Sequence, residues 1–208
     1  MLVKICGITT SEAAEAAAAA GADFIGFVFA ASRRKITPER AKMIAKSLSS
    51  PVKTVGVFVN ETVEQMVNIA EYVGLDYLQL HGDEGEAVSK QLPRPVIKAF
   101  SVKDKSIKNI MNYPCDYYLI DSPGGGTGKS FDWKLLDKFN LDASKLILAG
   151  GLNPENVQEA IRVVKPAGVD VSSGVETNGA KDIKKIKQFI HAAKNERKDE
   201  KIDSIYNA

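Results

Sequence analysis

KLILAGGLNPENVQEAIRVVKPAGVDV, residues 145–171, contains one complete strand–helix–strand unit. Short apolar, β-branched runs at 145–149 and 168–171 predict a strand at each end. Between them, residues 154–164 place apolar side chains three or four positions apart, which is the period of an amphipathic helix. Asn153-Pro154-Glu155 adds a start signal, because a capping residue precedes a proline at the first helical position. The unit is typical of a parallel sheet with helical crossovers.

This alternation repeats along the whole chain. Helical patterns also lie at 38–48, 63–73 and 182–193, and Thr37-Pro38-Glu39 repeats the capping signal. Strand starts are spaced by roughly 20 to 30 residues, as expected for eight βα units that close into one barrel. We therefore predict the α/β class, with a single (βα)8 TIM-barrel domain over residues 1–194. The eight predicted strands are 2–6, 23–29, 53–59, 76–80, 95–100, 116–120, 145–149 and 168–171.

The two ends of the chain refine this prediction. The alternative architecture is an open, doubly wound sheet, which usually has a Gly-rich first turn that binds a dinucleotide. Here the first turn is Cys6-Gly7-Ile8-Thr9, which lacks that fingerprint. Residues 195–208 are mostly polar and charged and lie beyond the last helical pattern, so we predict a flexible C-terminal tail.

The composition predicts a cytoplasmic protein without nucleic-acid or membrane partners. The 208 residues carry 28 Lys and Arg against 26 Asp and Glu, and the net charge of +2 is too balanced for a nucleic-acid-binding surface. Two cysteines, Cys6 and Cys115, argue against a disulfide scaffold and favour a reducing compartment. The N-terminus has no signal-peptide pattern, and no apolar run reaches membrane-spanning length.

In a (βα)8 barrel the active site lies at the C-terminal ends of the strands. A loop after the second strand carries three consecutive cations, Arg33, Arg34 and Lys35. The reactive or polar side chains that the sequence places at strand ends are Cys6, Gln79, His81, Asp121, Asp170 and Ser172. These side chains and the three cations come together only if the barrel closes.

Three loops after the late strands are rich in glycine and predict a phosphate site. They are GGGTGK at 124–129, GGLN at 150–153 and SSGV at 172–175. Glycines let backbone N–H groups approach an anion, and the start of a helix adds a positive dipole. In this fold the loops after the seventh and eighth strands frequently hold a phosphate. The alternative is that the glycines serve only tight turns and helix packing.

Cys6 and Asp121 are the candidates for acid–base chemistry. Cys6 ends the first strand, and its thiol needs a nearby cation or dipole to form the thiolate at neutral pH. Lys4 lies on the same face and either helps Cys6 or, in the interpretation we favour, forms a structural ion pair with Asp170. Asp121 follows the apolar run YYLI, where burial would favour the protonated carboxyl of a general acid. The structural alternatives are a small buried hydrophobe for Cys6 and a loop cap for Asp121.

The histidines argue against a metal centre. Two are present, His81 and His191, and neither has metal-ligand spacing to carboxylates or cysteines. His191 lies in the last helix and is predicted to be on the surface. For His81, a site electrophile and an ordinary loop residue are both open. Cys115 precedes its strand at the opposite end of the barrel and is predicted to be a packing residue.

Motifs at nearly every strand end form one combination. They are KICGIT (4–9), GFVF (26–29), VGVFVN (55–60), QLHG (79–82), GGTG (125–128) with FDW (131–133), GGLNPEN (150–156) and DVSSGVE (170–176). In this combination, from Met1 to about Ala193, the chain closely resembles the phosphoribosylanthranilate isomerase family of tryptophan biosynthesis. That family converts an aminoaldose phosphate into an aminoketose phosphate by an Amadori rearrangement, without cofactor or metal.

The resemblance implies roles for the candidate residues. Asp121 matches the general acid that protonates the ribose ring oxygen, and Cys6 matches the general base that removes the C2′ proton. Arg34 aligns with the arginine that binds the anthranilate carboxylate, a register that the neighbouring Arg33 and Lys35 leave open. The backbone groups expected around the phosphate are those of Gly126, Thr127, Gly151, Ser173 and Gly174. Further substrate-binding candidates are Gln79, His81, Gly128, Gly150, Asp170 and Ser172.

The expected partner is a phosphorylated small molecule, and the sequence leaves monomer and homodimer open. Two features depart from the family pattern, namely the short loop at 122–129 and the charged tail. Three other functions compete with the isomerase. A metal-dependent sugar-phosphate epimerase is disfavoured by the scarcity of histidine. A histidine-pathway isomerase with two aspartates is disfavoured by Cys6, and a phosphate-ligand-binding module would leave Cys6 and Asp121 inert.

Overall fold

The structure is a computed structural model that describes residues 1–101, 110–121, 132–139 and 141–206. Within these residues eight parallel strands pair in chain order, and β1 pairs with both β2 and β8, which closes the barrel. The predicted single-domain TIM barrel and its strands are confirmed, with only slight shifts at the strand ends. The strands are β1 (Leu2–Cys6), β2 (Phe24–Val28), β3 (Lys53–Phe58), β4 (Tyr77–Leu80), β5 (Val96–Ser101), β6 (Tyr117–Asp121), β7 (Leu146–Leu148) and β8 (Gly168–Val171).

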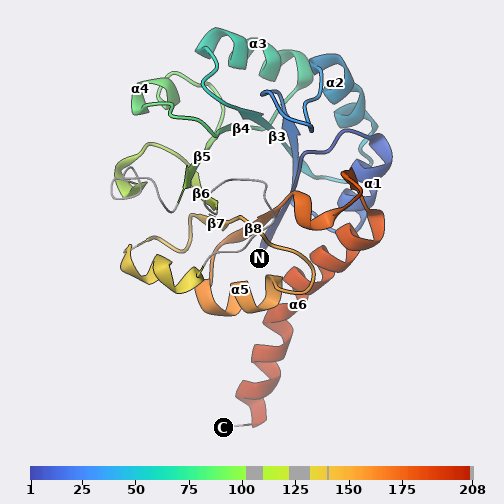
Figure 1. Ribbon diagram of the computed structural model, residues 1–208, viewed down its shortest axis with the longest axis vertical. Helices are drawn as coiled ribbons and strands as arrows, with labels where there is room; N and C mark the ends of the chain where they lie inside the picture. Colours follow the sequence, from blue (N-terminus) through green and yellow to red (C-terminus); the bar gives the residue numbers. More distant parts are fainter. Residues whose placement is uncertain (102–109, 122–131, 140, 207–208) are drawn as a thin grey trace.

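A ring of helices surrounds the barrel (Figure 1). Three of them begin alike, because the hydroxyls of Thr10, Thr37 and Thr62 each accept a hydrogen bond from a backbone N–H of the first turn. Pro38 follows Thr37 at the start of its helix, as predicted. The α-helices of the described residues are α1 (Ser11–Ala19), α2 (Pro38–Ser47), α3 (Val63–Val73), α4 (Glu86–Ser89), α5 (Val157–Val164) and α6 (Ile183–Tyr206), and the short 3-10 helices include η2 (Trp133–Lys138) and η3 (Ser173–Val175).

Two apolar layers hold the barrel together. Alternate strand residues point inward, and Phe24, Val55, Ile97 and Leu119 belong to the cluster inside the barrel. The Phe24 ring stands edge-on to Tyr77, with centroids 5.3 Å apart. The larger cluster packs the outer face of the strands against the helices. The middle of the barrel is therefore filled, and the strand ends are left for polar groups.

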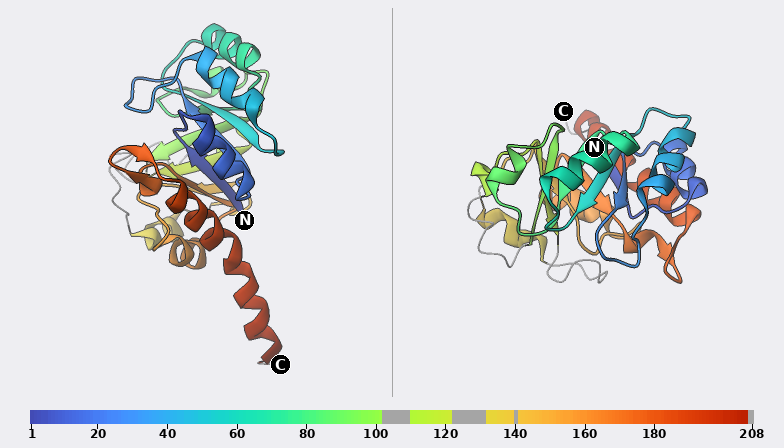
Figure 2. Two further views of the ribbon diagram at one scale, coloured as in Figure 1. Left: turned by 90° about the vertical axis from the view of Figure 1, so that its right-hand side faces the viewer. Right: turned by 90° about the horizontal axis from the view of Figure 1, so that it is seen from above.

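Two helix boundaries differ from the sequence prediction. The helix expected from residue 154 begins at Val157, because the side-chain oxygen of Asn153 accepts hydrogen bonds from the N–H groups of Glu155 and Asn156 and forms a separate turn. The helix expected to end at 193 continues to Tyr206 and projects away from the barrel (Figure 2, left). The flexibility predicted for residues 195–208 stays a prediction. None of the helices in the described residues is long and apolar enough to span a membrane.

The parallel strands give the barrel two different ends. In Figure 2 (right) both chain termini lie on one side, and the segments that follow β2 and β8 lie on the other. Because all eight strands are parallel, their C-terminal ends face this second side. Functional groups of (βα)8 barrels are found on that side.

Candidate active site

Four strand ends bring predicted reactive residues to the same end of the barrel. Cys6 is the last residue of β1 and Asp121 the last of β6, while His81 and Ser172 directly follow β4 and β8. Nε2 of His81 lies 3.8 Å from Oδ2 of Asp121. The hydroxyl of Ser172 donates a hydrogen bond of 3.1 Å to the carbonyl oxygen of Cys6. Closure of the barrel thus gathers groups that are far apart in sequence.

One layer below Cys6, Lys4 forms an ion pair with Asp170 inside the barrel. Nζ of Lys4 lies 2.8 Å from Oδ1 of Asp170, and Lys4 is 1% exposed. This confirms the predicted ion pair, which follows from the register of β1 and β8. Lys4 and Cys6 also influence each other electrostatically, so the ion pair does not exclude the second role considered for this lysine, which stays a prediction. Gly26 provides the space, because a Cβ there would lie 3.0 Å from Sγ of Cys6 and 3.3 Å from Nζ of Lys4.

The surroundings of Cys6 hold it mainly as the thiol in the free protein. Burial raises the pKa of Cys6 above its ordinary 9.0, and the lowering effects of Lys4 and Lys181 offset this only in part. Burial alone would lower the pKa of Lys4, but Asp170 and Cys6 raise it to about 12. Lys4 is therefore a permanent cation next to the sulfur and stabilises the thiolate whenever it forms.

Gln79 orients His81. Nε2 of Gln79 lies 2.8 Å from Nδ1 of His81, and Gln79 is 1% exposed. With the amide as donor, Nδ1 accepts and the ring proton sits on Nε2, which faces Asp121. Burial lowers the pKa of His81, and the charges of Lys4 and Lys98 act in the same direction, so the ring is neutral near pH 7. A neutral N–H of His81 is thus directed at the Asp121 carboxyl.

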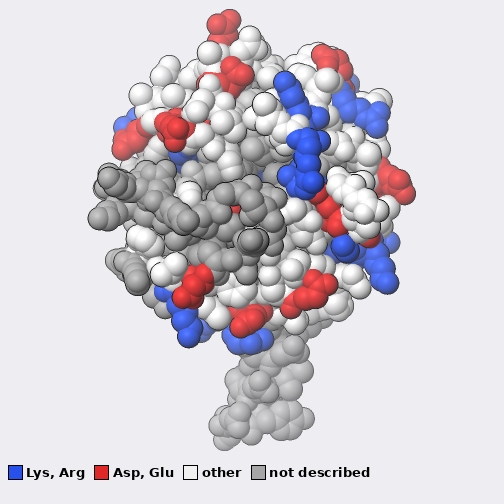
Figure 3. All heavy atoms as spheres, in the orientation of Figure 1, with Lys and Arg blue, Asp and Glu red and all other residues white. Residues whose placement is uncertain are grey.

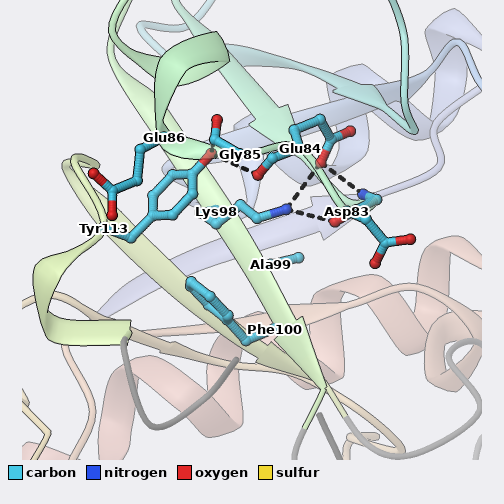
Figure 4. A pocket seen from close by; sticks show the side chains of 9 residues that line it. Asp83, Glu84, Gly85, Glu86, Lys98, Ala99, Phe100 and Tyr113 are labelled. Carbon is cyan, nitrogen blue, oxygen red and sulfur yellow. Dashed lines mark hydrogen bonds and ion pairs between the residues drawn. The ribbon is translucent and has the colours of Figure 1, made fainter. Parts of the chain in front are cut away.

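A buried ion pair anchors the loop that carries His81, and sequence reasoning missed it. Nζ of Lys98 lies 2.8 Å from Oε2 of Glu84, and their side chains are 5% and 2% exposed. The Glu84 carboxylate also accepts hydrogen bonds from the N–H groups of Asn60 and Gly82. Tyr113 donates a hydrogen bond to the carbonyl oxygen of Glu84, and Glu84, Lys98 and Tyr113 border a pocket of about 300 Å³ (Figure 4). The loop after β4 is therefore fixed to β3 and β5.

Arg34 is the most enclosed of the three cations after β2. Its side chain is 14% exposed, whereas that of Arg33 is 57% exposed. Nε of Arg34 lies 2.6 Å from Oε1 of Glu176, and Nη2 lies 3.1 Å from Oε2. The side chain passes over Gly7, where a Cβ would meet Cδ of Arg34 at 2.5 Å. Lys35 is exposed. This placement favours Arg34 over its neighbours as a site residue.

The partner of Arg34 belongs to a small hairpin that sequence reasoning also missed. β9 (Glu176–Thr177) pairs antiparallel with β10 (Ala180–Lys181) through a turn at Asn178 and Gly179, whose φ values are 52° and 81°. Lys181 places Nζ 2.9 Å from Oε1 of Glu176 and 2.9 Å from the carbonyl oxygen of Ser172. The Asn-Gly dipeptide was the available signal, because it is the strongest short-range indicator of a two-residue hairpin turn.

The loops after β7 and β8 meet where a phosphate site was predicted. Gly150 and Gly151 have φ values of 85° and 68°, a region that favours glycine. A Cβ on Gly174 would lie 1.8 Å from the carbonyl oxygen of Leu152, so only glycine allows this approach. Ser173 and Gly174 lie side by side in η3. Phosphate binding stays a prediction, and the candidates Gly126, Thr127 and Gly128 lie outside the described residues.

The remaining candidates have ordinary structural surroundings. His191 is exposed on α6, as predicted, and Cys115 is half-buried against the core, which fits a packing residue. In the part of the chain that the structure describes, no three His, Cys, Asp or Glu side chains are grouped so that they could hold a metal ion. Charges of both signs are spread around the rim of the face shown in Figure 3.

Comparisons with known proteins identify the family of this chain. The model of the N-(5'phosphoribosyl)anthranilate (PRA) isomerase family matches residues 3–192. The PRA isomerase of Oceanobacillus iheyensis is 52% identical over 195 residues, which cover 91% of this chain and 95% of that protein. Two solved structures each have 44% identity and a TM-score of 0.82 and cover 94% of this chain and 100% of their own. One shows monomers of the dimeric isomerase from Thermotoga maritima, and the other an isomerase in complex with reduced 1-(o-carboxyphenylamino)-1-deoxyribulose 5-phosphate. The chain therefore belongs to the N-(5′-phosphoribosyl)anthranilate isomerase family.

Proposed function

We propose that the chain converts N-(5′-phosphoribosyl)anthranilate into 1-(2-carboxyphenylamino)-1-deoxyribulose 5-phosphate by an Amadori rearrangement, in L-tryptophan biosynthesis. The observation that carries the proposal is the placement of Cys6 and Asp121 at the ends of β1 and β6, on the end of the barrel where Arg34 also lies. An acid, a base and a carboxylate-binding cation are the groups that this substrate requires. Family membership supports the same reaction.

Asp121 is the proposed general acid. Its protonated carboxyl donates the proton to the ribose ring oxygen while the C1′–O4′ bond breaks, and the nitrogen lone pair forms a C1′=N Schiff base. The His81 ring, with Nε2 at 3.8 Å from Oδ2 of Asp121, is neutral and puts no positive charge beside the carboxyl. The step opens the sugar and leaves Asp121 as a carboxylate.

Cys6 is the proposed general base. Its thiolate removes the C2′ proton, the electrons of that C–H bond form the C1′=C2′ bond, and the π electrons of the C1′=N bond return to the nitrogen to give an enolamine. A proton then returns to C1′ while the C2′ hydroxyl becomes the ketone, so substrate and product are isomers and no redox partner is needed. Lys4 stays beside the sulfur and lowers the free energy of the thiolate.

Other residues hold the two ends of the substrate. The Arg34 guanidinium binds the anthranilate carboxylate, and the backbone N–H groups of Gly151, Ser173 and Gly174 bind the phosphate. Gln79 and Asp170 are buried, and their contribution to binding passes through the residues that they orient, which are His81 and Lys4. The roles of Gly126, Thr127, Gly128, Gly150 and Ser172 in substrate binding are proposed on the family resemblance.

The proposed reaction needs no metal or cofactor, and we place it in the cytoplasm. Every residue assigned here comes from one chain, so a monomer and a homodimer are both compatible with the site. The Thermotoga maritima relative is dimeric.

The function is tested by mixing the purified chain with N-(5′-phosphoribosyl)anthranilate and following the loss of substrate fluorescence. We expect catalysed loss of fluorescence at a rate that excess chelator does not change. Inhibition by the chelator would favour the metal-dependent epimerase class. Binding of the substrate without turnover would favour a phosphate-ligand-binding module. Turnover of the histidine-pathway intermediate alone would favour the two-aspartate isomerase.

Replacing Arg34 with methionine is expected to raise KM by at least about tenfold with a smaller change in kcat, because a charge-assisted contact to the carboxylate is lost. The matched variant is Arg33→Met, which removes the neighbouring cation, whose side chain is 57% exposed. Steady-state kinetics of both variants show which of the two arginines binds the carboxylate. A raised KM in the Arg33 variant and an ordinary KM in the Arg34 variant would reverse the assignment.

A further inference from the structure

Glu176 lies at the centre of three cations. Its side chain is 5% exposed, and both carboxylate oxygens are engaged. Oε1 lies 2.6 Å from Nε of Arg34 and 2.9 Å from Nζ of Lys181. Oε2 lies 3.1 Å from Nη2 of Arg34 and 2.8 Å from Nη2 of Arg33. A carboxylate held in this way can restrain a long, flexible side chain that forms an ion pair with it.

The contact occupies one particular edge of the Arg34 guanidinium. A guanidinium offers five N–H groups in a planar fork and can bind carboxylates on more than one edge. Glu176 takes the edge formed by Nε and Nη2. The edge formed by Nη1 and the second N–H of Nη2 is not part of this contact, and a planar guanidinium can bind a second, bidentate carboxylate along it. Glu176 therefore fixes the plane of the guanidinium without using the edge that a ligand needs.

The hairpin that carries Glu176 is itself fixed. Lys185 donates a hydrogen bond of 2.9 Å to the carbonyl oxygen of Glu176, and Lys181 donates to that of Ser172. Burial would raise the pKa of Glu176, but hydrogen bonds from Arg34 and Lys181 lower it, so the carboxylate stays ionised at neutral pH. Neither a shift of the backbone nor protonation near pH 7 would release the guanidinium.

We propose that Glu176 is a positioning residue for substrate selection, because its carboxylate holds the Arg34 guanidinium ready to bind the carboxylate of the arylamine. This inference rests on the proposed function. A long side chain that is already immobilised loses little further rotamer freedom on binding. Glu176 therefore reduces the conformational entropy that Arg34 loses when the ligand binds. Glu176 affects the binding of the carboxylate end of the ligand and leaves the binding of the phosphate end unchanged.

The test is a calorimetric titration with two ligands, reduced 1-(o-carboxyphenylamino)-1-deoxyribulose 5-phosphate and the same compound without its carboxyl group. Glu176→Gln is expected to raise Kd for the carboxylated ligand by up to about tenfold, because one long side chain must then be immobilised on binding. Kd for the other ligand should change by less than about twofold. In the Arg34→Met background, Glu176→Gln should have no further effect on either ligand.

A purely structural role for Glu176 predicts different results. Equal weakening of both ligands, or a full additional loss in the Arg34→Met background, would overturn the proposal. Should Glu176→Gln fail to fold, Arg34→Lys replaces it, because lysine keeps the charge and lacks the planar fork. Wild-type selectivity in Arg34→Lys would then overturn the proposal. A wild-type chain that binds neither ligand would refute the proposed function itself.

Discussion

Replacing Cys6 with alanine is expected to lower kcat by at least about 10²-fold while the fold is retained. The variant lacks the proposed base for the C2′ proton, whereas the groups proposed to bind the carboxylate and the phosphate are unchanged, so KM should change little. Folding should survive because Lys4 keeps Asp170 as its partner and no buried charge is left alone. The fluorescence assay gives kcat and KM, and near-ultraviolet circular dichroism checks the packing.

Cys115→Ala is the matched control, because Cys115 precedes β6 at the opposite end of the barrel and should leave turnover unchanged. Thiolate absorbance gives an independent readout. Burial raises the pKa of both thiols, that of Cys115 to about 11, so the difference between wild type and Cys6→Ala isolates Cys6. We expect this difference to titrate above pH 9.0. Near wild-type turnover in Cys6→Ala would falsify its assignment as the base.

Asp121→Ala is expected to lower kcat by at least about 10²-fold as well, because the ring oxygen then leaves without a proton donor. Asp121 lies at the end of β6 with a side chain that is 16% exposed, so its removal leaves space at the mouth of the barrel and does not open the core. Thermal unfolding should therefore change little. Asp121→Asn keeps the shape but cannot donate an acidic proton, and it should be as inactive as the alanine variant.

Asp83→Ala is the control for Asp121. Asp83 is an exposed carboxylate in the loop after β4, and the hydrogen bond of that residue to Asn60 comes from its backbone N–H. Its removal should leave kcat unchanged. If Asp121→Asn instead keeps turnover within a few-fold of wild type, the residue has a structural role and another group supplies the proton.

Much of the fold and part of the site could be predicted from sequence because their signals are local or follow from barrel closure. The apolar runs mark the strands, and the threonines before three helices mark their starts. Lys4 and Asp170 are 166 positions apart, yet their pairing was predictable, because closing the barrel places β1 beside β8. Cys6 and Asp121 were identified by their positions at strand ends.

The missed residues lie where no period constrains the chain. Glu176 follows a 3-10 helix and reaches Arg34 across 142 positions, so no repeat of strand or helix indicates the contact. Lys98 points away from the barrel interior, and a lysine in a strand gives no sign that Glu84 of the preceding loop will cover it. The helix start at Val157 was misplaced because the Asn153 side chain closes a turn that resembles a helix cap.

Because β1 pairs with β8, residues near the start of the chain acquire their site partners only after the last strand has been synthesised. Cys6 leaves the ribosome early, but its carbonyl oxygen is bound by Ser172, its neighbouring Lys4 is neutralised by Asp170, and Arg34 is held by Glu176. All three partners belong to the last strand or to the segment after it. A nascent chain without that strand exposes two unpaired sheet edges and carries Cys6 and Arg34 without the partners that hold them. The proposed site is therefore assembled only when the final strand closes the barrel.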